Sequence, residues 1–246
     1  MNPYFLMQKK QQSNKLLIVL FGESNSGGIA PNSSALSSEL LPRNLKILNN
    51  STLQFEPLDI GTNNLIGHIG LEYAMYNSHG MELELANQYD NGYFGVQDVY
   101  LVKAGAGGSK VSDWTSGGSY FTTFLNRVNA ARELLSVPPE NIIFMLSLGI
   151  NDKGINTPVA TYKNGIKTLI QNAKSFLSLS EIKLSIMGFQ FVTNLSISDF
   201  NTAISEVATE LNVKTFSTTG LTKIPDGYHL DYAGMKAATD NFLNSL

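Results

Sequence analysis

Four short segments carry residues whose types and spacing could cleave an ester. The first is Gly22–Gly28, in which Ser24 follows a Gly-Glu pair directly after an apolar run. A serine at a strand-to-helix turn can project its hydroxyl while the backbone N–H groups that follow face an anion. The segment is not the Gly-x-Ser-x-Gly elbow, because Ser26 stands where that motif has glycine. By itself, a turn that caps a helix explains it equally well.

A base for such a hydroxyl stands near the C-terminus, in Asp226-Gly227-Tyr228-His229. A serine nucleophile needs a base to take its proton, and the base needs a partner that fixes its tautomer. An aspartate three residues before a histidine supplies both from one loop. A lone histidine in a loop is usually structural, but one preceded by a carboxylate and paired with a glycine-flanked serine favours catalysis.

Two further segments could stabilise an anion. Lys103–Lys110 is rich in glycine, but Lys110 stands at the last glycine of a dinucleotide fingerprint, and Val111 stands where a P-loop has Ser or Thr. Nucleotide binding is therefore disfavoured. A glycine N–H of this loop could be an oxyanion donor, and a tight turn is the alternative. Asn151, in Gly-Ile-Asn-Asp, could donate from its amide or cap the loop that follows.

These segments must be positioned by alternating strands and helices. Five apolar runs predict strands: Leu16–Phe21, Val99–Val102, Ile142–Leu148, Ile182–Met187 and Val213–Phe216. Helical spacing predicts helices over Gly70–Ser78, Phe121–Leu135, Tyr162–Leu177, Asp199–Leu211 and Tyr232–Leu246. Such alternation indicates a doubly wound parallel sheet. Ligands of these sheets bind beyond the carboxyl ends of the strands, which is where the chemical segments stand.

Length and composition fit one α/β domain. The chain has 246 residues, of which 43% are hydrophobic, and we expect a single domain over 15–246 after a flexible N-terminal extension, 1–14. Residues 28–66 are rich in Asn and Ser and are predicted to form a loop-rich insert.

Charge and cysteine usage exclude several classes. The net charge of -3, without a cluster of Lys and Arg, argues against a nucleic-acid partner. The absence of cysteine excludes disulfides and thiolate catalysis, and no two of the three histidines have metal-ligand spacing. Residues 1–14 have no long apolar stretch, so we expect neither a signal peptide nor a membrane span. The compartment (secreted or periplasmic if a signal was removed, otherwise cytoplasmic) and the oligomeric state are left open.

In order, the four segments resemble the blocks of the SGNH (GDSL-like) hydrolases, over most of the chain from Gly22 to His229. Within that superfamily, the chain is most similar to the carbohydrate acetylesterases related to sialate O-acetylesterases and acetylxylan esterases. Their Gly-Gly-Thr-x-Ile-x-x-Trp pattern is matched, with conservative changes, by Gly-Gly-Ser-Lys-Val-Ser-Asp-Trp at 107–114. The segment 70–74 resembles the helix that these enzymes place between the first two blocks. Glu23 stands where they usually have glutamine.

The resemblance implies a three-layer α/β/α sandwich with a flavodoxin-like parallel sheet of about five strands in the order 2-1-3-4-5. It implies that Ser24 attacks the ester, that His229 takes the serine proton and that Asp226 orients the imidazole. The oxyanion would be held by the backbone N–H groups of Ser24 and Gly107 and by the Asn151 side chain. It implies no metal or organic cofactor.

Three residues are candidate contacts to the substrate. Gly108 lies beside Gly107 and replaces it as oxyanion donor if the alignment is one residue out. Trp114 could line an acyl or sugar pocket, or anchor its loop in the core. Glu23 could contact substrate or act electrostatically on His229, but a hydrogen-bond anchor for the serine turn is a simpler role.

The sequence thus predicts a serine esterase that removes short acyl groups, in particular O-acetyl groups of a carbohydrate, with a small-molecule or glycan ester as partner. A general short-chain esterase or thioesterase of the same fold is the nearest alternative. A carbohydrate-binding module without activity, and a flavodoxin-like nucleotide binder, are alternatives of other classes.

Overall fold

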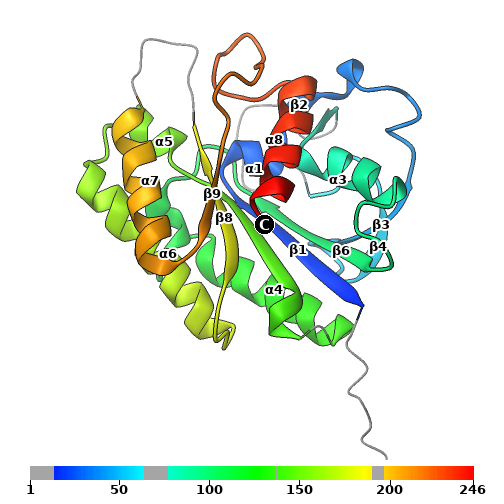
Figure 1. The fold of residues 1–246 in the computed structure, drawn as a ribbon, viewed down its shortest axis with the longest axis horizontal. Helices are drawn as coiled ribbons and strands as arrows, with labels where there is room; N and C mark the ends of the chain where they lie inside the picture. Colours follow the sequence, from blue (N-terminus) through cyan, green and yellow to red (C-terminus); the bar gives the residue numbers. More distant parts are fainter. Residues whose placement is uncertain (1–13, 64–76, 137, 190–196) are drawn as a thin grey trace, which may run out of the picture.

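The computed structural model describes residues 14–63, 77–136, 138–189 and 197–246, and its centre is a sheet of seven strands (Figure 1). Along the chain these are β1 (Lys15–Gly22), β3 (Arg43–Leu48), β4 (Phe55–Leu58), β6 (Asp98–Gly105), β7 (Ile142–Ser147), β8 (Lys183–Gly188) and β9 (Lys214–Ser217). Across the sheet the order is β4-β3-β6-β1-β7-β8-β9. Neighbours run parallel, except that β4 pairs antiparallel with β3.

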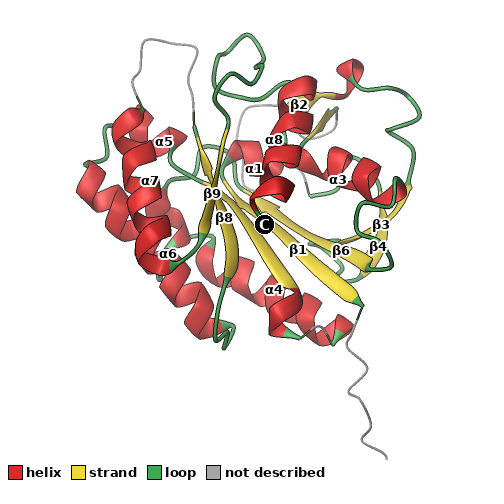
Figure 2. Ribbon diagram, viewed as in Figure 1, coloured by secondary structure: helices red, strands yellow, loops and turns green. Residues whose placement is uncertain are grey.

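Helices cover both faces of this sheet (Figure 2). One layer contains α4 (Phe121–Leu135), α6 (Val159–Phe176) and α7 (Ser198–Leu211); the other contains α1 (Ser24–Gly27), α3 (Met81–Asp90) and α8 (Tyr232–Ser245). This separation follows from right-handed crossovers, because the chain crosses the sheet in opposite directions before and after β6. The short elements are α5 (Ile150–Gly154) and the 3-10 turns η1 (Asn32–Ser34), η2 (Val111–Trp114) and η3 (Pro139–Asn141). A two-stranded sheet joins β2 (Ala30–Pro31) to β5 (Ser78–His79).

The burial of the central strands explains the continuous apolar runs that predicted them. In β1, every residue from Leu16 to Gly22 is buried, as are the last five residues of β6. Side chains of a strand alternate between its faces, so continuous burial requires cover on both sides, and the sequence shows it as an unbroken apolar run. The three-layer sandwich is confirmed. So is the order 2-1-3-4-5 of the five predicted strands, which are β6-β1-β7-β8-β9 in space.

The predicted number of strands was too low. The insert at 28–66, predicted to be loop-rich, contributes β3 and β4, and β4 is not parallel. In β3, exposed polar residues alternate with buried apolar ones, and β4 at the edge is mostly exposed or half-buried. Strands of this kind give no continuous apolar run, so the pattern that revealed the central strands could not reveal them.

Four helix predictions agree with α4, α6, α7 and α8 to within a few residues. The fifth, Gly70–Ser78, lies outside the described residues except at its end, where Ser78 belongs to β5. The helix α3 was missed. The predicted extension 1–14 also lies outside the described residues except for Asn14, and the domain bounds 15–246 stay a prediction. None of the helices in the described ranges is at once long and apolar enough to cross a bilayer.

Candidate active site

The carboxyl ends of β6, β1 and β7 lie side by side, and the segments that follow them meet at one edge of the sheet (Figure 1). Strand β1 leads into the Ser24 turn, β6 into the glycine loop and β7 into α5, which carries Asn151. The segment between β9 and α8 brings His229 to the same edge, where it meets Ser24. The predicted chemical segments are therefore brought together by strand order.

The Ser24 turn depends on glycine where the chain leaves β1. Gly22 has φ +123°, and a Cβ on it would lie 1.9 Å from the backbone oxygen of Ser147 on β7. A Cβ on Gly105 of β6 would lie 2.2 Å from Gly27. These close backbone contacts, which only glycine allows, seat α1 directly on the ends of three strands. Ser24 at its first position is 4% exposed.

Ser24, His229 and Asp226 form one line of hydrogen bonds. Ser24 Oγ lies 2.8 Å from His229 Nε2, and His229 Nδ1 lies 2.5 Å from Asp226 Oδ2. Asp226 Oδ1 also accepts from the backbone N–H groups of Tyr228, at 2.8 Å, and His229, at 3.1 Å. Burial raises the pKa of Asp226, but the hydrogen bonds from His229 and from these N–H groups outweigh it, and the pKa is lowered. An ionised Asp226 accepts Nδ1–H, which leaves Nε2 free to accept the serine proton.

Asn25 joins the serine turn to the histidine loop, a role that the sequence did not reveal. Its Oδ1 accepts from the Leu230 N–H at 3.1 Å, and its Nδ2 donates to the Tyr228 carbonyl at 3.5 Å. These bonds hold the backbone on both sides of His229. The Gly-x-Ser-Asn pattern contains this residue, but its role follows from the closeness of positions 25 and 230 in space, which the sequence does not show.

Glu23 lies beneath the nucleophile and is 0% exposed. The Ser24 hydroxyl donates to its Oε2 at 2.6 Å, the Ser147 hydroxyl donates to its Oε1, and the Asn25 N–H donates at 3.3 Å. This position fits the predicted role of Glu23 as a hydrogen-bond anchor for the serine turn. Direct contact with a substrate does not fit, because no part of this residue reaches the surface.

The predicted oxyanion donors lie around the ends of β6 and β7. Asn151 is half-buried, and its Nδ2 donates to the Ser109 carbonyl at 2.9 Å. Among the described residues, the backbone N–H groups of Ser24 and Gly107 have no acceptor. Gly108 is exposed, has φ +72° and has nothing within 4 Å of an added Cβ. The assignment of Ser24, Gly107 and Asn151 as donors, with Gly108 as the alternative to Gly107, stays a prediction.

Trp114 fixes the glycine loop from below. It is 1% exposed, its Nε1–H donates to Ser109 Oγ at 2.9 Å, and Ser109 Oγ donates to the Ala106 carbonyl at 2.7 Å. This position fits the anchoring interpretation. Together with Tyr120 and Arg127 it lines a cavity of about 200 Å³, and contact with a substrate there stays a prediction.

Asp152 ties α5 to the same loop. It is 1% exposed, and its Oδ2 accepts from the Val111 N–H at 3.0 Å. Burial raises the pKa of Asp152 to about 6, and the hydrogen bonds from Val111 and Thr157 only partly oppose this. The residue therefore connects η2 to α5.

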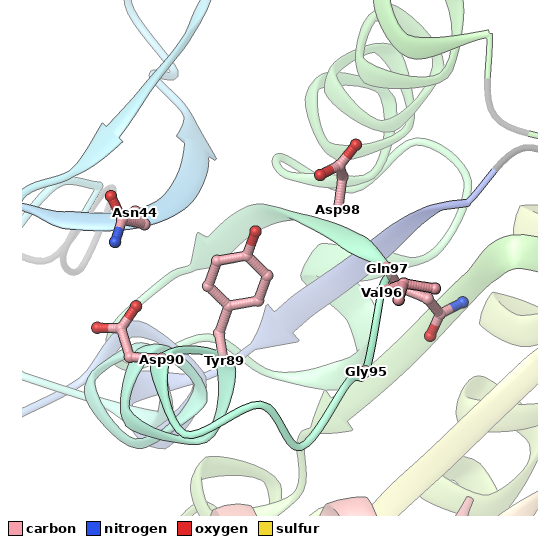
Figure 3. Close-up of a pocket in the computed structure, with 7 residues that line it drawn as sticks. All are labelled: Asn44, Tyr89, Asp90, Gly95, Val96, Gln97 and Asp98. Carbon is pink, nitrogen blue, oxygen red and sulfur yellow. The ribbon is translucent and has the colours of Figure 1, made fainter.

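A hollow of about 490 Å³ elsewhere on the surface does not belong to this site (Figure 3). It is lined by Tyr89, with Asn44, Asp90 and Gly95–Asp98 around it. Asp98 begins β6, whereas the nucleophile turn meets the other end of that strand at Gly105. Eight residues of strand separate the two by roughly 23 Å. An ester in this hollow is therefore out of reach of Ser24. No three carboxylate or imidazole groups in the described ranges gather as metal ligands.

A protein-family model described as carbohydrate esterase, sialic acid-specific acetylesterase, matches residues 14–245. The chain belongs to this family. It is an ester hydrolase of the acetylesterase-like kind, and the predicted SGNH superfamily is confirmed. No curated protein matches the sequence.

Solved structures similar to this chain have the same fold. A protein from Arabidopsis thaliana is 17% identical with a TM-score of 0.73, over 94% of this chain and 98% of its own. NanS is 12% identical with a TM-score of 0.66, over 95% and 97%. Axe2, an acetyl-xylooligosaccharide esterase from Geobacillus, is 13% identical with a TM-score of 0.57, over 95% and 94%. At these identities the likeness establishes the fold.

Proposed function

We propose that this esterase removes O-acetyl groups from a carbohydrate through an acyl-enzyme on Ser24. The observation that carries the proposal is the hydrogen-bonded line from Ser24 to His229, 2.8 Å, and from His229 to Asp226, 2.5 Å. A hydroxyl, an imidazole and a carboxylate in this order are what nucleophilic attack on an ester requires. The family to which the chain belongs, and the name of Axe2, support an acetylated carbohydrate as substrate.

In the first half of the reaction, Ser24 Oγ attacks the acetyl carbonyl carbon while its proton passes to His229 Nε2. The carbonyl oxygen becomes an oxyanion, which the Ser24 and Gly107 N–H groups and the Asn151 amide would hold. The tetrahedral intermediate then breaks its bond to the sugar oxygen. That oxygen takes the proton from His229 and leaves as an alcohol, and acetyl-Ser24 remains.

In the second half, water attacks acetyl-Ser24 and gives its proton to His229. The intermediate expels Ser24 Oγ, which recovers the proton, and acetate leaves. Asp226 stabilises the imidazolium in both halves without taking its proton. The Asn25 bridge between the two loops supports this scheme, because proton transfer in both directions needs a constant distance between Ser24 and His229.

Hydrolysis of p-nitrophenyl acetate by the wild type and by Ser24→Ala tests the mechanism. We expect the substitution to lower kcat by at least roughly 10⁴-fold while the circular dichroism spectrum is unchanged. Ser175→Ala is the matched control, because Ser175 is exposed on α6. Equal activity of Ser24→Ala and wild type would exclude Ser24 as the nucleophile.

Substrate class is tested separately, by acetate release from O-acetylated sialic acid and from acetylated xylooligosaccharides beside p-nitrophenyl butyrate and octanoate. Acetate release from either acetylated sugar with higher kcat/KM than any p-nitrophenyl ester supports the carbohydrate. A preference for the octanoate would overturn it in favour of a general esterase.

A further inference from the structure

The hydrogen-bonded line at the active site continues beyond the nucleophile and ends on a second carboxylate. Glu23 Oε2 lies 2.6 Å from Ser24 Oγ, which lies 2.8 Å from His229 Nε2. Asp226 closes the other end at 2.5 Å from His229 Nδ1. Four polar groups thus stand in the order carboxylate, hydroxyl, imidazole, carboxylate.

The number of protons on this line matters. With a neutral imidazole, Nδ1–H donates to Asp226, and both neighbours of Ser24 Oγ are acceptors. The single serine proton can then satisfy Glu23 or His229, but not both. With a protonated imidazole, Nε2–H donates to Ser24 Oγ and the serine hydroxyl donates to Glu23. Every contact then has one donor and one acceptor. A proton on Glu23 would satisfy the same contacts, but both of its oxygens already accept from Ser147 and Asn25, which stabilises the carboxylate, so the geometry favours the imidazolium.

The surroundings of Glu23 do not neutralise its negative charge, which therefore acts on Ser24 and His229. Its other partners are neutral donors, the hydroxyl of Ser147 and the Asn25 N–H and amide groups. No cationic side chain contacts it within the described part of the chain. Neutral donors stabilise a carboxylate without cancelling its charge.

The other titratable groups near the line do not replace that charge. Burial, with the charges of Asp152 and Glu23, raises the pKa of Tyr162 on α6 well above its usual value, and its hydroxyl donates to the Leu148 carbonyl at 2.6 Å, so Tyr162 adds no charge. Between α3 and β6, Glu82 and Lys103 compensate each other at 2.8 Å, both fully buried. The histidine loop adds Asp226, which contacts the far side of the ring.

We infer that Glu23 is a positioning residue that stabilises the protonated form of His229 through the Ser24 hydroxyl, and so sets the lower pH limit of the esterase. The inference rests on the proposed function of Ser24 and His229. A base that is more readily protonated at rest is free to act only at higher pH, while the imidazolium formed during the attack of Ser24 is stabilised. Glu23 therefore affects the pH range more than the maximal rate.

The test is the pH dependence of kcat/KM for p-nitrophenyl acetate. Glu23→Gln keeps the shape and an acceptor for Ser24 but removes the charge. We expect its acid limb to lie about one pH unit below that of the wild type, with a plateau within about tenfold. Glu23→Leu also removes the anchor, and we expect a loss of more than about 100-fold at every pH. Glu206→Gln, an exposed charge change on α7, should superimpose on the wild type.

A Glu23→Gln profile that superimposes on the wild type, or that moves to higher pH, would overturn the inference and leave Glu23 as an anchor only. If Glu23→Gln does not fold, Ser147→Ala replaces it. That change removes a neutral donor from Glu23, so the acid limb should move to higher pH, and an unmoved limb contradicts the inference.

A measurement without turnover separates the two proposals. Without substrate, the imidazole titration of His229 followed by NMR should have a lower midpoint in Glu23→Gln than in the wild type, both of which keep the Ser24 hydroxyl, and equal midpoints would count against the role of Glu23. Equal turnover of wild type and Ser24→Ala would instead contradict the proposed function. An inactive Ser24→Ala with an unmoved Glu23→Gln acid limb contradicts only the inference.

Discussion

The two halves of the candidate site use hydrogen bonds in opposite ways. In the nucleophile half, Ser24 Oγ, Glu23 and Asn25 are buried and contact one another, and their bonds extend to the histidine loop. In the oxyanion half, the N–H groups of Ser24 and Gly107 have no acceptor among the described residues, and the half-buried Asn151 amide donates one of its two hydrogens to the Ser109 carbonyl.

The difference follows from what each half has to do. A nucleophile and its base must hold one distance through the reaction, so each is bonded from several sides. An oxyanion hole must offer donors that are already oriented but not yet used, because the charge that they bind exists only in the transition state. Substitutions in the first half should therefore disturb proton transfer, and substitutions in the second should disturb charge stabilisation alone.

The largest effect should come from Asp226→Asn. The amide cannot hold the same tautomer of His229, so we expect kcat for p-nitrophenyl acetate to fall on the order of 10⁴-fold. The lowered pKa of Asp226 means that its contribution to stability is present above its ordinary value and is lost only as the pH falls through the lowered value. The activity of the wild type near neutral pH should therefore not depend on titration of Asp226.

Asp240→Asn on the exposed side of α8 is the control for charge. A loss of less than tenfold for Asp226→Asn, with the control unchanged, would mean that the nucleophile half does not depend on its carboxylate. The comparison between the halves would then fail.

The next effect should come from Asn151→Ala in the oxyanion half. Loss of one such donor typically lowers kcat about 10²- to 10³-fold, and KM should change by less than about threefold. The fold should lose only the bond to the Ser109 carbonyl, which is worth about 1 kcal/mol. Asn164→Ala on the exposed face of α6 is the matched control. Unchanged turnover would remove Asn151 from the mechanism.

The third effect, from Asp152→Asn beneath the oxyanion half, should be on the stability of the fold. The pKa of Asp152 is raised from 3.8 to about 6, so its contribution to stability is present below about pH 4 and is lost as the pH rises through about 6. Two units correspond to an upper limit of roughly 3 kcal/mol. Asparagine does not ionise, so the variant should gain stability relative to wild type between pH 4 and pH 7 in urea unfolding. If the free energy of unfolding changed with pH in the same way for both proteins, ionisation of Asp152 would not destabilise the fold.

The smallest effect should come from Gly108→Ala. The φ of +72° costs an alanine about 1 kcal/mol, and nothing lies within 4 Å of the new Cβ. The backbone N–H is retained, so kcat for p-nitrophenyl acetate should change by less than about threefold. A large rise in KM for an acetylated sugar, without one for the small ester, would instead identify Gly108 as a contact for the sugar.

The sequence predicted those parts of the fold whose environment is uniform. Seven of the eight residues of β1, the last five residues of β6 and all but one residue of β7 are buried, and the sequence shows this burial as apolar runs. In β3, next to the edge strand β4, exposed polar residues alternate with buried apolar ones. The helix α3 contains Glu82 and Glu84, whose carboxylates are buried, so its apolar spacing is interrupted by the charges that it pairs in the interior.

The candidate site divides in the same way. Ser24, Asp226 and His229 were recognisable because residue type and local spacing are enough to suggest them, and the structure has them in hydrogen-bond contact. The roles of Asn25 and Ser147 depend on contacts across more than 100 positions of sequence. No local pattern contains such a contact, and only the order of the strands creates it.

The antiparallel strand β4 has a consequence for the behaviour of the protein in concentrated solution. An open sheet can extend by pairing its outer strand with a strand of another molecule. Here the outer strand on this side is only four residues long, Phe55–Leu58, and its third residue, Pro57, is exposed and has no N–H to donate. Growth of fibrils or stacked dimers from this edge is therefore opposed by the chain itself.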